Sequence, residues 1–208
     1  MWIDYSTEAG LLRLPVNSTP LPIRLGIWLW LIAALLVGRL GLLSHLPMPA
    51  VQVVLVALTA ALLLGYFRGR ALRVWLDGLD LRALLAFHLT LFVGVYFLLL
   101  YNRGELPYDF AVRGGWGDII AASLALLICV VPLGAGLRWR AITIWNVIGF
   151  IDIMMVVISA ARNGLAGNPQ MKLLTVLPLS LLPTFIVPII IATHVIIFLR
   201  LRREAPAP

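Results

Sequence analysis

The chain has 208 residues, 62% of them hydrophobic and 12% charged, and its mean hydropathy is +1.03. A soluble domain is about 45–50% apolar and about 25% charged, so these values exclude an ordinary soluble protein and predict a multi-pass membrane protein. The net charge of +7 would suggest nucleic acid in a soluble protein, but the cations here flank apolar runs, where they meet lipid headgroups, so no nucleic-acid partner is expected.

The chain is expected to divide into three parts. Residues 1–24 mix apolar and charged side chains, which predicts a cytoplasmic or interfacial N-terminal segment. Residues 25–199 predict a domain of six transmembrane helices, because runs long enough to cross roughly 30 Å of hydrocarbon recur through it. Residues 200–208 are basic and then proline-rich, which predicts a cytoplasmic tail. The fold class is therefore all-α, a polytopic membrane bundle.

The six apolar runs are separated by shorter polar stretches. Their expected positions are about 25–43, 50–67, 83–101, 118–137, 141–161 and 173–199. Residues 68–82 mix Arg and Asp with large apolar side chains, which predicts a short helix lying in the membrane interface.

The cations are distributed unevenly between the two sides of the predicted bundle. Eleven of the 16 fall on the side that holds both termini. The positive-inside rule therefore places both termini in the cytoplasm. Lys172 is the only lysine, and a composition rich in Arg, Leu and Ala is typical of a GC-rich bacterial genome. The expected location is the bacterial inner membrane.

The stretch 102–118 is the longest polar, turn-rich interruption in the second half of the chain. It holds several charges and three glycines within four residues, and it is expected to form an outer loop. Asp118 ends this stretch and opens an apolar run. One interpretation is that its carboxylate caps the N-terminus of the next helix.

The other interpretation of Asp118 concerns catalysis. The run Gly115-Trp116-Gly117-Asp118 resembles the Gly-x-Gly-Asp motif of intramembrane aspartyl proteases. Those enzymes place two aspartates close together on different spans, where they share a proton. Here Asp109 lies in the same predicted loop, and Asp152 is expected roughly 10 Å deeper in the membrane from the helix rise. The pattern therefore does not favour a protease, and no enzymatic activity is predicted.

Ionisable residues inside apolar spans are the main candidates for function, because they are costly in lipid and usually face the protein interior. They are Arg39, His88, Asp118, Asp152 and His194. Asp152 lies on a semi-polar helical stripe with Asn146 beside it, so these residues form a candidate ion, proton or substrate site. The alternative is a hydrogen bond or salt bridge between helices, with Arg39 or Trp28 as the partner.

The two histidines suggest a different chemistry. His88 and His194 are expected at similar depth, roughly 9 Å from the same side, on different spans. Such a pair could supply the axial ligands of a b-type haem. Membrane cytochromes of this kind typically carry two pairs, and a lone pair can equally be hydrogen-bonded polar residues. No metal site is predicted.

The sixth apolar run contains three prolines, Pro178, Pro183 and Pro188. Each lacks a backbone donor, so the helix is expected to bend or unwind. Broken helices occur in transporter sites, and they also occur as simple packing kinks.

Several short motifs occur between about residues 85 and 200. They are Gly104-Glu105-Leu106-Pro107-Tyr108-Asp109-Phe110-Ala111, Gly114-Gly115-Trp116-Gly117-Asp118, Trp145-Asn146 with Gly149 and Asp152, and Leu182-Pro183-Thr184 with Pro188 and His194. Together they resemble a family of small bacterial membrane proteins. The resemblance implies six spans and a bacterial inner membrane, and it implies no catalytic activity.

The sequence most favours a non-enzymatic accessory or structural subunit of a larger membrane complex, because it has short loops, few buried charges and no nucleotide-binding motif. The expected partners are the lipid bilayer and other membrane subunits or further copies of the chain. One alternative is a small-solute or ion- and proton-coupled carrier that uses Asp152. A second is a haem-binding redox subunit that uses His88 and His194.

Overall fold

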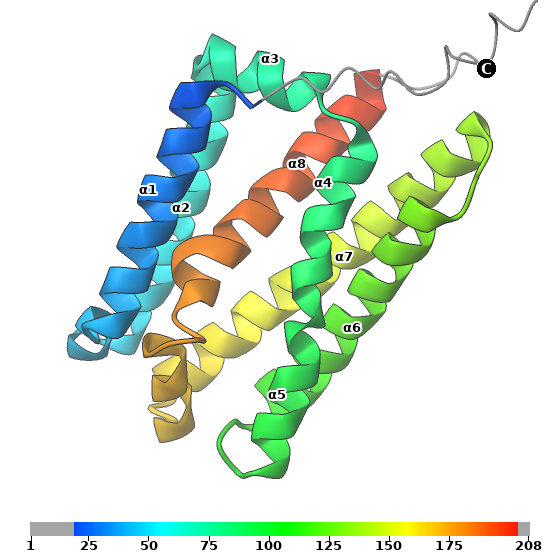
Figure 1. The fold of residues 1–208 in the computed structure, drawn as a ribbon. Coiled ribbons are helices and arrows are strands. Elements are labelled where there is room, and N and C mark those ends of the chain that lie inside the picture. The colour runs from blue at the N-terminus through cyan, green and yellow to red at the C-terminus, as the bar shows by residue number, and fades with distance from the viewer. Residues whose placement is uncertain (1–18, 204–208) are drawn as a thin grey trace, which may run out of the picture.

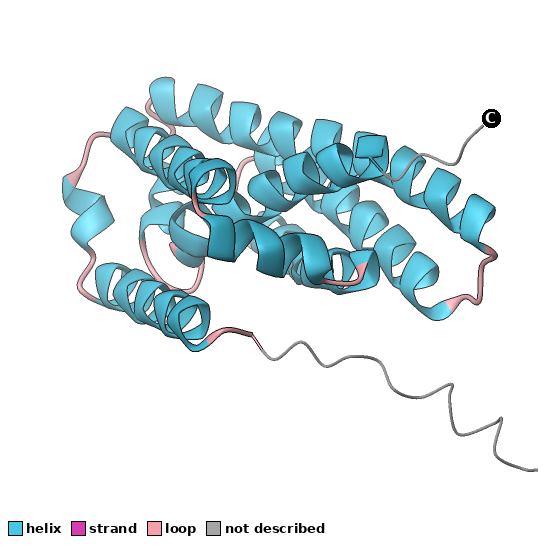
Figure 2. Ribbon diagram, turned by 90° about the horizontal axis from the view of Figure 1, so that it is seen from above, coloured by secondary structure: helices cyan, strands magenta, loops and turns pink. Residues whose placement is uncertain are grey.

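The computed structural model describes residues 19–203. Residues 1–18 of the predicted N-terminal segment and residues 204–208 of the predicted tail lie outside this range. Between these limits every regular element is helical (Figure 2). Six of the described helices are long and apolar enough to cross a membrane, at 21–39, 50–68, 81–102, 108–130, 135–165 and 182–203. The predicted fold class, an all-α bundle of six transmembrane helices, is confirmed.

The regular elements follow one another with short connections. In chain order they are α1 (Leu21–Arg39), η1 (Leu42–His45), α2 (Met48–Arg68), α3 (Arg70–Gly78), α4 (Leu81–Phe87), η2 (His88–Phe92), α5 (Val93–Asn102), α6 (Tyr108–Val130), α7 (Ala135–Leu165), η3 (Pro169–Thr175), η4 (Leu182–Ile186) and α8 (Val187–Arg203). Three elements, α4, η2 and α5, together form the third span.

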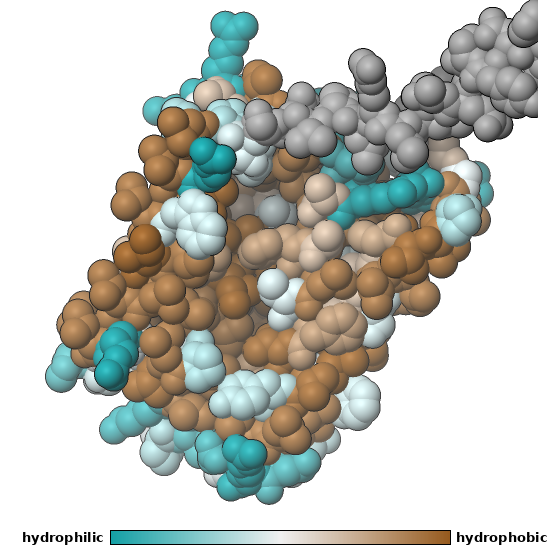
Figure 3. Space-filling view, in the orientation of Figure 1, coloured by the Kyte–Doolittle hydropathy of each residue, from teal (hydrophilic) through white to brown (hydrophobic). Residues whose placement is uncertain are grey.

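The bundle has two distinct ends. The short helix α3 runs across one end, next to the start of α1 and the end of α8 (Figure 1). We call this the Arg-rich end, because the arginines of α3 and of the last turn of α8 lie there. Hydrophilic residues gather at both ends, and the flanks between them are hydrophobic (Figure 3). This distribution is that of a membrane protein, and the cytoplasmic position of the Arg-rich end stays a prediction.

The prediction that residues 102–118 form an outer loop is wrong. Helix α6 already begins at Tyr108, and only residues 103–107 connect it to α5. The glycines lie inside the helix at close approaches: a Cβ at Gly115 would lie 2.9 Å from the Gly94 carbonyl oxygen, and one at Gly114 would lie 3.0 Å from Val156. In lipid, small residues let helix backbones pack closely. A glycine-rich run that indicates a turn in water is here a packing face.

The fourth and fifth spans also differ from their predicted bounds. Helix α6 ends at Val130, and α7 runs from Ala135 through the expected boundary at Arg138 and Arg140 to Leu165. Arginine can stay inside a helix end because its long side chain extends towards the surface. Arg138 does so and donates to the Leu133 carbonyl oxygen at 2.6 Å, in the connection between the two helices.

The sixth span is interrupted, as its prolines predict. The expected run from 173 begins as η3 and turns, and continuous helix starts only at Leu182, one residue before Pro183. At this break the Trp30 indole N–H of α1 donates to the Thr184 carbonyl oxygen at 2.8 Å, and the Thr184 hydroxyl donates to Ser180 at 2.6 Å. The backbone groups that a broken helix frees are satisfied in this way by neighbouring groups.

Candidate functional site: a buried acid pair and a histidine pair

Two aspartates from neighbouring spans meet inside the bundle. Asp118 of α6 is 2% exposed, and its side chain is within hydrogen-bonding reach of the Asp152 side chain of α7. Two carboxylates are both acceptors, so a hydrogen bond between them requires a proton on one of them. We call these two residues the acid pair.

A glycine makes this meeting possible. A Cβ at Gly117 would collide with the Asp152 carboxyl group, so the carboxyl lies directly against the α6 backbone. The predicted difference in depth of roughly 10 Å between Asp118 and Asp152 is therefore wrong. The predicted N-cap role of Asp118 is also wrong, because α6 begins ten residues earlier, at Tyr108. Both errors follow from the same misplaced helix start.

The acid pair lies between two cavities. One, of about 650 Å³, lies between α6 and α7, and we call it the polar cavity. Its lining is Asp109, Arg113, Gly114, Asp152, Met155, Val156, Ile158, Ser159, Arg162, Asn163 and Ala166. The other, which we call the central cavity, has about 50 Å³ and is lined by Asp118, Gln52 and apolar side chains of α2, η2, α5, α6, α7, η3, η4 and α8. Each carboxyl group thus borders a different cavity.

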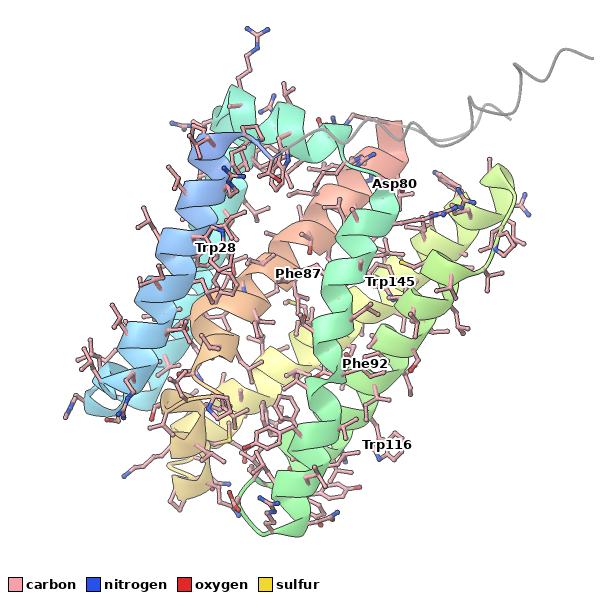
Figure 4. All side chains as sticks on the ribbon, viewed as in Figure 1. Trp28, Asp80, Phe87, Phe92, Trp116 and Trp145 are labelled. Carbon is pink, nitrogen blue, oxygen red and sulfur yellow. The ribbon has the colours of Figure 1, made fainter. Side chains whose placement is uncertain are left out.

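The two histidines also meet, closer to the Arg-rich end. His88 and His194 are fully buried, and their ring centroids lie 4.4 Å apart, edge to face. The Trp145 ring contacts both, with centroids at 4.8 Å from His88 and 5.2 Å from His194. We call His88 and His194 the histidine pair. Figure 4 labels Trp145, which marks their level on α7, and Trp116, which marks the level of the acid pair on α6.

The predicted site residue Asn146 holds His194 in place. His194 Nδ1 lies 2.7 Å from Asn146 Oδ1, and Asn146 Nδ2 donates to the His194 carbonyl oxygen at 3.1 Å. This reciprocal arrangement fixes both side chains. It also joins α7 to α8 six residues before Asp152 on α7.

The arrangement of the histidine pair does not fit a haem that would have His88 and His194 as its two axial ligands. Rings in direct contact have centroids about 4.5–7 Å apart, so at 4.4 Å no iron can lie between them. The outward nitrogens also have different surroundings. His88 Nε2 lies 3.4 Å from the Thr193 hydroxyl, whereas His194 Nε2 faces Gly149.

The remaining predicted residues lie elsewhere. Arg39 is the last residue of α1 and is exposed, and Trp28 is 56% exposed on the same helix. Neither belongs to the buried group. Within residues 19–203, no group of three or more His, Cys, Asp or Glu side chains could hold a metal ion.

Two polar residues near the site were missed from the sequence. Gln52 lines the central cavity beside Asp118, and Thr193 contacts His88. The signal for Gln52 was available, because it is a lone amide within the apolar run of the second span. Thr193 gave no signal of its own, since a threonine in a membrane helix usually bonds the carbonyl one turn back.

Comparison with known proteins places the chain in a family. Residues 48–202 match the family model described as Domain of unknown function (DUF8737). The chain belongs to this family. No curated protein matches it, and no solved structure does. The matched region contains the acid pair and the histidine pair, and it does not include α1.

Proposed function

We propose that this protein is a carrier that binds protons at the acid pair and moves them across the membrane, alone or coupled to a small solute. The observation that carries the proposal is the meeting of Asp118 and Asp152 inside the bundle, each beside a different cavity. Intramembrane carboxyl groups that face the protein interior are typical of proton relays in pumps and transporters.

A proton fits this site better than a metal ion does. The two carboxyl groups lie within reach of each other, and a hydrogen bond between them would itself contain a proton. A divalent ion would need further ligands around it, and no such group of ligating side chains exists within residues 19–203. Exchange of the shared proton between Asp152, at the polar cavity, and Asp118, at the central cavity, would transfer it from one compartment to the next.

An intramembrane aspartyl protease is the second candidate. One observation favours it, because Asp118 ends a Gly-x-Gly-Asp run and pairs with an aspartate on the neighbouring span. A protease dyad acts on one peptide bond, so both carboxyl groups must open to the same substrate site. Here they border different cavities, which supports proton transfer over hydrolysis. We expect no cleavage of a labelled transmembrane peptide, and cleavage lost in both Asp118→Asn and Asp152→Asn would favour the protease.

The proposal is tested by proton flux into liposomes that contain the purified protein and an internal pH-sensitive dye. Flux is driven by an imposed pH gradient, with and without a mixture of small cellular solutes outside. We expect Asp152→Asn to slow the flux roughly a hundredfold, the scale of losing one positioned proton carrier. The matched control is Asp109→Asn, because Asp109 lines the same cavity but is exposed and paired with Arg113.

Two outcomes would contradict the carrier. Wild-type flux no faster than that of empty liposomes under both conditions would leave the accessory subunit of a larger membrane complex as the better function, and partner chains that co-purify in fixed proportion would support it. Equal flux in wild type and Asp152→Asn would remove the acid pair from any transport path.

A separate measurement addresses the haem. We expect the reduced-minus-oxidised visible spectrum of the purified protein to show no haem band, because the contacting rings of His88 and His194 leave no space for an iron between them. A band that disappears in His88→Ala would show that the histidine pair opens to bind a cofactor, and would support the redox function instead.

A further inference from the structure

Four buried polar atoms at or near the acid pair have no hydrogen-bond partner within the described part of the chain. They are Asp118 Oδ1, Asp152 Oδ2, Gln52 Oε1 and His194 Nε2. Leaving such atoms unpaired is costly, so each indicates a place for a polar group or a water molecule that it binds. The central cavity beside Asp118, at about 50 Å³, is large enough for a buried water molecule.

His194 lies one helical turn from the acid pair on both helices. Its Nε2 would be 3.3 Å from a Cβ at Gly149, and Gly149 precedes Asp152 by three residues on α7. Gly149 in turn faces Ala121, which follows Asp118 by three residues on α6. Residues three apart on a helix are neighbours on one face, with Cβ atoms about 5–6 Å apart, so His194 Nε2 and the acid pair lie on adjoining turns.

The tautomers of both histidines follow from their partners. His88 Nδ1 lies 3.0 Å from the Leu84 carbonyl oxygen, which only accepts, so Nδ1 carries the hydrogen. His194 Nδ1 likewise donates to Asn146 Oδ1, because the Asn146 amide nitrogen already donates to a carbonyl. Both Nε2 atoms are therefore free to accept a proton. That of His194 is on the side of Gly149, towards the acid pair.

A second large cavity lies beyond the histidine pair. It has about 590 Å³, lies between α1, α3, α4 and α8 at the Arg-rich end, and we call it the apolar cavity. It opens as the hollow in front of α8 in Figure 3. Thr193 lines it, and the Thr193 hydroxyl also lies 3.4 Å from His88 Nε2. Thr193 thus joins the histidine pair to this cavity.

We infer that the proton path continues from the acid pair through His194, His88 and Thr193 to the apolar cavity at the Arg-rich end. This inference rests on the proposed function and supplies the second half of its path. Asp118 gives its proton to His194 Nε2, which leaves a carboxylate and an imidazolium. The imidazolium keeps its Nδ1–H on Asn146 and gives its Nε2 proton to His88 Nε2. The Thr193 hydroxyl accepts that proton and releases its own hydrogen, which it donates to the Ile189 and Ile190 carbonyl oxygens, to water that enters the apolar cavity. Asp152 then reprotonates Asp118 from the polar cavity.

The main test is His194→Gln in the liposome flux assay. Glutamine keeps a polar side chain near Asn146 but does not carry a proton as imidazole does, so we expect flux to fall roughly a hundredfold. In the same preparations the infrared carbonyl band of a protonated carboxyl group, absent from Asp118→Asn, is expected to persist. A merely structural role for His194 would not leave the protonated acid pair intact while it abolishes flux.

A second variant covers the case in which His194→Gln does not fold. Thr193→Val keeps the shape of the side chain and removes the hydroxyl at His88 Nε2, and we expect it to slow flux about tenfold. Its matched control is Thr59→Val, because the Thr59 hydroxyl is also buried and donates only to a carbonyl one turn back, at Leu55. The control is expected to transport at the wild-type rate.

The outcomes separate this inference from the proposed function. If Asp152→Asn abolishes flux while Thr193→Val and a folded His194→Gln transport like wild type, the acid pair works and the path through the histidine pair is wrong. If Asp152→Asn also transports like wild type, the proposed function itself fails. Equal loss in Thr193→Val and Thr59→Val would likewise overturn the path, because the effect would then follow from any buried hydroxyl.

Discussion

The span formed by α1 and the spans formed by α5 to α8 are built differently. Only 11% of the most apolar stretch of α1 is buried inside the protein, against 67% for the last span. In the first region a Cβ at Gly26 would meet nothing within 4 Å, whereas one at Gly94 would collide with the Gly115 backbone. Asp118, Asp152 and His194 belong to the second region, and His88 lies in η2, in the span that α5 completes.

The difference shows which helices hold the closely packed and ionisable residues of the candidate site. Elements η2, α6, α7 and α8 bring small residues, two aspartates and two histidines together, and the DUF8737 match at 48–202 covers all of them. Helix α1 lies outside that match and touches the rest at Trp30, beside the break in the last span, and at Gly38, where a Cβ would collide with Ser180 and Leu177. The site is therefore expected to be more sensitive to small changes in η2 and α5 to α8 than to changes on the exposed face of α1.

The largest difference between the two regions is expected from a single added methyl group. Gly94→Ala places a Cβ against the Gly115 carbonyl and should destabilise the protein by about 1–3 kcal/mol through overpacking. Gly26→Ala adds the same group in open space and should be neutral or stabilising, by up to about 1 kcal/mol from helix propensity. The free energy of unfolding in mixed detergent measures both. Equal effects would contradict the contrast between the regions.

These glycines also explain what the sequence did and did not predict. The number of spans, the short helix α3 and the broken last span follow from hydrophobic length, amphipathic pattern and proline, which act locally. The start of α6 does not follow from local patterns, because Gly114 and Gly115 indicate a turn unless the helix that faces them is known. That one boundary moved Asp118 from a helix cap to the interior, and it concealed the acid pair.

The histidine pair also shows what the sequence can and cannot predict. Their similar depth is a prediction from their positions along the spans, and the two rings do meet. Depth alone does not tell which nitrogen of each ring is free to accept a proton. That depends on the hydrogen-bond partners of the rings, which are Asn146, Leu84 and Thr193. A pattern that suggested haem ligands is thus a contacting pair whose free nitrogens have different neighbours.

Substitutions at two tryptophans, one in each region, are expected to have effects of intermediate size on the free energy of unfolding. Trp145 donates its indole N–H to the Ala121 carbonyl at 2.9 Å and is 1% exposed, while Trp30 donates to Thr184 at 2.8 Å at the edge of the bundle. Trp145→Phe should cost about 1–2 kcal/mol, because it also removes ring contacts with the histidine pair. Trp30→Phe should cost about 0.6 kcal/mol, the typical value for a hydrogen bond between membrane helices.

The same tryptophan variants can be read for flux. If Trp145→Phe slows proton flux and Trp30→Phe does not, the interior region carries both stability and function. A larger loss of unfolding free energy in Trp30→Phe would mean that the break in the last span depends on α1 more than its burial indicates. Thermal aggregation in mild detergent provides an independent check on both proteins.

The smallest effect is expected at Arg39, which the sequence offered as a partner for Asp152. Arg39 ends α1 and is exposed, and Asp152 instead meets Asp118 against the Gly117 backbone. Arg39→Gln should therefore change neither the unfolding free energy nor the proton flux, since exposed charges contribute about 0–1 kcal/mol at most. Its matched control is Arg113→Gln, because Arg113 is also exposed but borders the polar cavity next to Asp152. If Arg39→Gln slowed flux and Arg113→Gln did not, α1 would have to approach the acid pair during transport, and the separation between the two regions would hold only for this conformation.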